Sequence, residues 1–140
     1  MSCLLVETTA DAVALFRAAL PKGEGEACVF VLPLDANGKA LAKPVPVSAG
    51  SEDGSATVDA GTILREALTR GADEIIVACN HPSGDPRPSK ADMAAVETLR
   101  AAAKLLGVTF VDHIILGAAD SAGGQGFTSL AELAAEEAEG

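Results

Sequence analysis

The sequence contains no tryptophan and no tyrosine, and it has only four phenylalanines. Flat aromatic side chains are the platforms on which single-stranded nucleic acids stack, so a binding site of this class is not expected. No segment approaches the roughly 18 consecutive apolar residues of a membrane span, and the first residues lack the basic start of a signal peptide. We therefore expect a cytoplasmic protein that makes no membrane contact.

Basic residues are also scarce. Ten Lys and Arg stand against twenty Asp and Glu, which gives a formal net charge of −10. Binding to duplex DNA needs clustered Lys and Arg, whereas these ten lie singly between residues 17 and 104. Duplex DNA is therefore not an expected partner, and the acidic C-terminal stretch is interpreted as a solvated helix end.

The three cysteines, Cys3, Cys28 and Cys79, are odd in number and widely spaced, which does not indicate a disulfide framework, and they are interpreted as reduced thiols. The 140 residues, 49% of them hydrophobic, can build a core without disulfides or a structural metal. We expect a single domain over residues 1–140, in which a bound metal would serve chemistry rather than folding.

Strand and helix patterns alternate along the chain. Helical spacing and caps predict helices over residues 10–20, 60–70, 90–106 and 129–137. Short apolar runs predict strands over residues 3–6, 28–34, 41–47, 75–78 and 109–116. The prolines at 44 and 46 each remove a backbone donor, so the strand 41–47 is expected at a sheet edge. This order predicts an α/β fold with a mixed β-sheet flanked by helices.

Three potential metal ligands follow the strand 75–78. Cys79 and His81 are two residues apart and so leave a strand on the same side, and Asp92 falls in the first turn of the next helix. A thiolate, an imidazole and a carboxylate with an open fourth position are typical of catalytic zinc, which supplies hydroxide near neutral pH. The proline-rich loop between these residues would hold its shape without regular hydrogen bonding.

Each ligand also has an ordinary structural interpretation. Ser89 and Asp92 fit a helix-capping pattern. Cys79 at a strand end can be a small core residue, and His81 can be a solvated loop residue. It is their joint spacing that favours a metal site.

The segment 79–117, which includes CNHPSGDPRPSKAD and VDHIILG, resembles the RadC-like branch of the JAB/MPN (JAMM) metalloprotease superfamily. The superfamily pattern is H-x-H-P followed by S-x-x-D, and the RadC branch has HNHPSGDPxPS and later LDHIIIG. The resemblance implies a mixed sheet with cytidine deaminase-like architecture. It also implies a zinc-dependent hydrolase that cleaves a peptide or isopeptide bond in a protein or peptide substrate.

The resemblance assigns roles to individual residues. His81 and Asp92 become zinc ligands, and Ser89 becomes the donor to the developing oxyanion. Cys79 stands where the family has its first histidine ligand. A thiolate is a competent zinc ligand, but it lowers the formal charge of the metal and its ligands from +1 to 0, which implies a weaker Lewis acid.

The expected general base is displaced in this sequence. The family has a glutamate eight residues before the aspartate that ends its strand, and counting back from Asp35 reaches Ala27. Glu26 is the neighbouring carboxylate, but a shift of one residue along a strand turns a side chain to the other face. A β-bulge near Pro33 would re-aim Glu26 into the site as the base. Without such a bulge, Glu26 is an exposed loop residue.

Asp112 and His113 also match the family pattern. Adjacent strand residues point to opposite faces, so at most one of them faces the site. That residue is either a partner of a metal ligand or one half of a buried polar pair.

Two functions of different classes are compatible with these features. One is the hydrolase, and the other is a catalytically impaired JAB/MPN module that binds metal or protein. RadC-like proteins also carry an N-terminal helix-hairpin-helix region linked to DNA binding, which leaves a DNA-repair association as a third, weaker interpretation. The edge strand and the alanine-rich helices are compatible with a homodimer.

Overall fold

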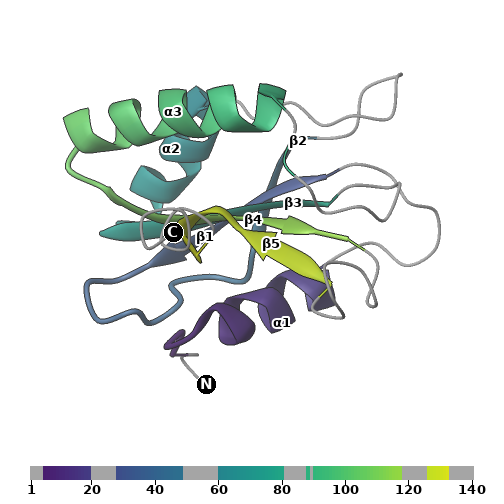
Figure 1. The fold of residues 1–140 in the computed structure, drawn as a ribbon. Helices are drawn as coiled ribbons and strands as arrows, with labels where there is room; N and C mark the ends of the chain where they lie inside the picture. Colours follow the sequence, from purple (N-terminus) through teal and green to yellow (C-terminus); the bar gives the residue numbers. More distant parts are fainter. Residues whose placement is uncertain are drawn as a thin grey trace.

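The computed structural model describes residues 5–19, 28–48, 60–80, 88, 90–117 and 126–132. In chain order, the elements are α1 (Thr9–Ala19), β1 (Val29–Leu34), β2 (Val45–Ser48), α2 (Ala60–Thr69), β3 (Glu74–Asn80), α3 (Lys90–Leu105), β4 (Thr109–Leu116) and β5 (Phe127–Ser129). The five strands form one sheet in the order β2-β1-β3-β4-β5 (Figure 1). Only the pair β3–β4 is parallel, which confirms the expected mixed sheet.

Helices cover both faces of the sheet. Helices α2 and α3 lie together on one face, and α1 lies on the other (Figure 1). Side chains alternate between the two layers along β1: Val29 and Val31 pack towards α2 and α3, whereas Phe30 and Leu32 pack towards α1. All six residues of β1 are buried, as expected of a strand covered on both faces.

Most of the predicted elements are confirmed, with small shifts at their ends. The strand 109–116 has the predicted bounds, and β2 lies at the sheet edge as its prolines require. Thr8 caps α1, because its hydroxyl accepts a hydrogen bond of 3.2 Å from the Asp11 amide. Of the predicted strand 3–6, Leu5 forms only an isolated bridge to Lys39, and residues 3 and 4 lie outside the described residues.

The C-terminal part of the described chain differs from the prediction. Ser129 was expected to begin a helix, but it is the last residue of the strand β5, and helical structure starts at Leu130. Phe127 pairs with Leu116 and is buried with the α1 layer, so tertiary packing extends the sheet by this short strand. A strand of three residues leaves too little alternation in the sequence to be recognised.

A left-handed glycine makes the turn that leads from α3 into β4. Gly107 has φ 74°, and the Val108 amide donates a hydrogen bond of 3.0 Å to the Ala103 carbonyl, which closes the last turn of the helix. The chain therefore reverses within a few residues and enters β4 alongside β3. The position of this turn contributes to the register between β3 and β4.

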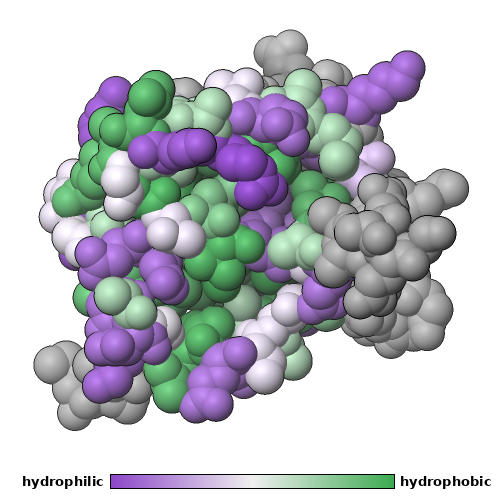
Figure 2. Space-filling model, turned by 60° about the vertical axis from the view of Figure 1, so that its left-hand side comes forward, coloured by the Kyte–Doolittle hydropathy of each residue, from purple (hydrophilic) through white to green (hydrophobic). Residues whose placement is uncertain are grey.

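Apolar side chains reach the surface among polar ones on the face drawn in Figure 2. The most exposed large apolar residue in the described ranges is Leu105, at 88%, and the adjacent Leu106 is 52% exposed. Among the described residues, no helix combines the length and the apolar character needed to cross a membrane.

A buried carboxylate ties β4 to the chain after β5. Asp112 is 8% exposed and accepts hydrogen bonds from the Ser129 hydroxyl and from the Ala131 and His113 amides. Burial raises the pKa of this carboxyl group, while those hydrogen bonds oppose the shift. The Ser129 hydroxyl also accepts a hydrogen bond from the Glu132 amide, so one side chain joins strand and helix.

We predict that Ser129→Ala lowers the free energy of unfolding by about 2 kcal/mol, because a buried carboxylate oxygen loses its donor. Urea denaturation monitored by circular dichroism measures the change. Thr128→Ala is the matched control, since Thr128 is the preceding residue of β5 and is only half-buried. Equal midpoints for the two variants would contradict the role given to Ser129.

Candidate metal centre

Three side chains from three different elements converge at one point of the structure. The Cys79 thiol comes from β3, the Asp92 carboxylate from α3 and the His113 imidazole from β4. One potential ligand atom of each lies within 4.8 Å of the other two. No other group of this kind occurs among the described residues.

The parallel pairing of β3 and β4 brings Cys79 and His113 together. In the register, His113 pairs with Val77 and Ile115 pairs with Cys79. Val77, Cys79 and Ile115 all belong to the core under α2 and α3. His113 precedes Ile115 by two residues and so points to the same face. Its Nε2 atom lies 3.5 Å from Cys79 Sγ.

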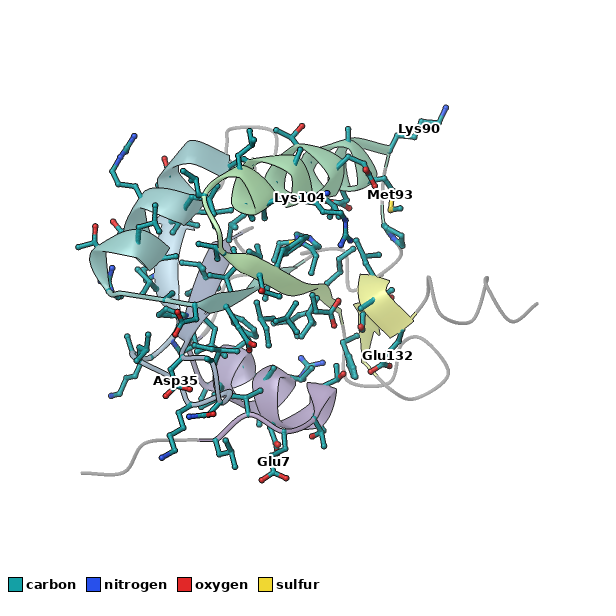
Figure 3. All side chains as sticks on the ribbon, turned by 90° about the vertical axis from the view of Figure 1, so that its left-hand side faces the viewer. Glu7, Asp35, Lys90, Met93, Lys104 and Glu132 are labelled. Atoms are coloured by element: carbon teal, nitrogen blue, oxygen red, sulfur yellow. The ribbon has the colours of Figure 1, made fainter. Side chains whose placement is uncertain are left out.

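Helix α3 supplies the third group from above this face. Asp92 is the acidic residue of its first turn and is half-buried. Lys90 begins the helix and points away from the body of the molecule, so its charge does not approach the cluster (Figure 3). A carboxylate in the first turn is favoured by the helix dipole even without a ligand.

Two of the three members of the cluster, Cys79 and His113, are buried in the apolar core. Cys79 is 4% exposed and His113 is 1% exposed. Burial, and secondarily the nearby Asp92 carboxylate, raise the pKa of the Cys79 thiol far above its ordinary value. In the absence of a cation, Cys79 is therefore a neutral thiol at physiological pH. A bound dication would reverse this preference, and the thiol would release its proton to solvent on binding.

The donor set fits zinc. Sulfur and imidazole nitrogen suit Zn²⁺, whereas Mg²⁺ and Ca²⁺ prefer oxygen ligands alone. With ordinary zinc bond lengths and tetrahedral angles, a ligand sulfur and a ligand nitrogen lie about 3.6 Å apart. The observed 3.5 Å between Cys79 and His113 matches this separation. One thiolate and one carboxylate also balance the two positive charges of the ion.

The structure brings together two of the three ligands expected from the sequence. Cys79 and Asp92 lie in the cluster, and their role as ligands stays a prediction. His81, Ser89 and Glu26 lie outside the described residues. His113 is the member to which the sequence pattern assigned no definite role. The alternation of side chains allowed at most one of Asp112 and His113 to face the site, and the register with β3 shows that it is His113.

Two further contacts organise the sheet edge at which β3 and β4 both end. Arg17 of α1 donates hydrogen bonds to the carbonyls of Gly117 and Gly126, at 3.3 and 2.7 Å. Asn80 accepts a hydrogen bond of 2.7 Å from the Cys28 amide through its side chain. No local sequence signal indicated the role of Arg17, because its partners are main-chain atoms far along the chain.

The model of the RadC-like JAB domain family matches residues 6–135. The chain belongs to the RadC-like JAB domain family. The match covers the whole sheet and all three members of the cluster. This agrees with the resemblance seen in the segment 79–117.

Several relatives of this chain share the name UPF0758 protein. A UPF0758 protein of Coprothermobacter proteolyticus is 36% identical over 115 residues, covering 80% of this chain and 48% of that protein. Another, from Actinobacillus pleuropneumoniae, is 41% identical over 109 residues, 78% of this chain and 48% of its own length. A third, from Carboxydothermus hydrogenoformans, is 50% identical over 62 residues, 44% of this chain and 27% of its own length. The chain thus spans about half the length of the first two.

We predict that Cys79 in metal-free protein is alkylated by iodoacetamide more than about tenfold more slowly than Cys28 at about pH 8. The reason is that burial and a raised pKa keep Cys79 as a thiol, whereas Cys28 is only half-buried. Mass spectrometry of the peptides gives each rate separately. In urea-unfolded protein the two rates should converge. Equal rates in the folded protein would contradict the buried neutral thiol.

Proposed function

We propose that this RadC-like JAB domain is a zinc-dependent hydrolase of the JAMM metallopeptidase type, acting on peptide or isopeptide bonds. The observation that carries the proposal is the convergence of Cys79 and Asp92 at the N-terminus of α3, within 4.8 Å of a buried imidazole. A nearby cation stabilises a carboxylate that is partly buried beside an apolar core, and a buried neutral thiol becomes a ligand when such a cation binds. A bound metal ion would give both groups one common role.

The proposal gives each residue a task. Cys79, His81 and Asp92 hold the ion, which when bound supplies a water of lowered pKa and polarises a carbonyl group. Ser89 donates a hydrogen bond to the carbonyl oxygen as negative charge develops on it. Ser89 immediately precedes Lys90, the first residue of α3, and the dipole of that helix favours negative charge at this end.

Glu26 is the proposed general base that accepts a proton from the attacking water. It precedes Cys28 by two residues, and Cys28 is joined to Asn80 at the end of β3. Cys28 therefore lies beside the end of the strand that carries Cys79. This proximity along the chain supports the choice of Glu26 over carboxylates of more distant segments.

The substrate is proposed to be a protein or peptide in the cytoplasm. Duplex DNA is a poor alternative, because the net charge of −10 would repel it. Since the chain spans about half of its longer relatives, these proposals concern the domain alone.

A second candidate is a catalytically impaired JAB domain that binds metal or a protein partner. Cys79 favours it, because a thiolate in place of a neutral imidazole weakens the ion as a Lewis acid. The exposed Leu105 and Leu106 at the end of α3 are compatible with a protein contact. Metal binding without hydrolysis is the outcome that would distinguish this function from the first.

We predict that the purified protein binds about one zinc ion per chain, whereas Cys79→Ala combined with His81→Ala abolishes binding. Elemental analysis after dialysis measures the zinc content. Cys28→Ala is the matched control, since it removes a half-buried thiol from outside the cluster and should retain the metal. If the wild type carries no more zinc than the double variant, both the ligands and the hydrolase are wrong.

We predict that removing the metal leaves the secondary structure intact, because the two apolar layers form a core without it. Zinc at about 100 times its dissociation constant should then stabilise the wild type by about 2.7 kcal/mol. Far-UV circular dichroism and thermal melts of apo and zinc-loaded protein test both points. If the protein unfolds when a chelator removes the metal, the metal has a structural role and this prediction is wrong.

We predict chelator-sensitive cleavage of a mixed peptide library by the zinc-loaded protein. Ser89→Ala should lower the rate by about a hundredfold or more with zinc content unchanged, because it removes only the oxyanion donor. Mass spectrometry of the products with time provides the measurement. Zinc-loaded protein that leaves the library intact would favour the impaired module.

A further inference from the structure

His113 makes a contact that the family's ligand pattern does not account for. Its Nε2 atom lies 3.5 Å from Cys79 Sγ, and it belongs with Cys79 and Asp92 to the group that closes within 4.8 Å. The ring is 1% exposed, so it has no role at the surface. An isolated S–H to imidazole hydrogen bond would explain the 3.5 Å distance, but it would not require a carboxylate from a third element at the same point.

We infer that His113 is itself a ligand of the zinc ion, binding through Nε2 beside Cys79 and Asp92. This inference rests on the metal binding in the proposed function and adds a residue to it. Sulfur and nitrogen ligands of one tetrahedral zinc ion are about 3.6 Å apart, so the pair needs almost no movement to share an ion. Nε2 must present its lone pair, which selects the tautomer with the proton on Nδ1.

The substitution in this chain makes such a role chemically reasonable. The family's first ligand is an imidazole, and here it is the smaller thiolate of Cys79. His113 restores an imidazole to the ligand set from the neighbouring strand. The neutral ring adds no charge, so the total charge of the ion, thiolate and carboxylate remains zero.

A further protein ligand would change the reactivity of the ion. If His81 also binds, four protein ligands surround the ion, which is typical of a closed site rather than one with an open position. An attacking water would then need a fifth position or the displacement of one ligand. His113 would in this way hold the hydrolytic site in a resting state.

The test is NMR of wild-type protein that carries labelled histidine ring nitrogens and an NMR-active cadmium isotope as the zinc substitute. The chain has two histidines, His81 and His113, so each ring can be assigned with a His81→Gln variant. We expect scalar coupling between cadmium and His113 Nε2. A direct coupling is needed because removing a residue that only hydrogen-bonds to a ligand also weakens metal binding, by about 10–100-fold.

The possible outcomes separate the inference from the proposed function. Coupling to His113, with or without coupling to His81, supports the inference. Cadmium bound to the protein with no coupling to His113 overturns it and leaves the proposed function standing. Protein that binds no cadmium and no zinc overturns both. The coupling itself is measured on the wild-type chain, and the His81→Gln variant serves only to assign the two rings.

Discussion

The parallel pairing of β3 with β4 is the constraint on which the candidate metal centre depends. A parallel pair requires a crossover connection, and here α3 provides it over one face of the sheet. The two strands therefore end at the same edge, and the first turn of the helix lies above them. Cys79 lies in β3, His113 in β4 and Asp92 in α3. A change in the register between β3 and β4 would therefore move Cys79 and His113 apart.

Burial and charge act together at this point. Cys79 and His113 occupy buried positions in the core that α2 and α3 cover. Burial raises the pKa of the Cys79 thiol. On the opposite face, the buried carboxylate of Asp112 is held by three hydrogen-bond donors. Asp112 and His113, which are adjacent in β4, thus place their polar groups in different environments. Asp112 is paired within the protein, and the cluster around Cys79 is suited to a cation.

The sequence predicted the elements whose signals are local. Periodicity, glycine and proline alone were enough to predict three elements. These are the strand 109–116, the helix α3 with its end before Gly107, and the proline-bearing edge strand β2. Strand β5 and the contact of Arg17 with Gly117 and Gly126 depend on packing between distant segments, and no local signal marked them. The same holds for His113, whose choice over Asp112 needed the register of β4 against β3.

In the proposed zinc site, Cys79 stands where the resembling family has a histidine, and this difference would affect metal affinity and hydrolytic power in opposite directions. A thiolate binds zinc well, and its negative charge together with that of Asp92 would cancel the charge of a bound ion. The same cancellation weakens the pull on a water or carbonyl oxygen. A site that gains an imidazole from His113 as well would hold its ion more tightly still and leave less room for a substrate oxygen. The Cys79 thiolate and the His113 imidazole would thus strengthen metal binding and lower the rate of hydrolysis. Whether the domain is a hydrolase or an impaired module would then depend on how easily one ligand leaves the ion.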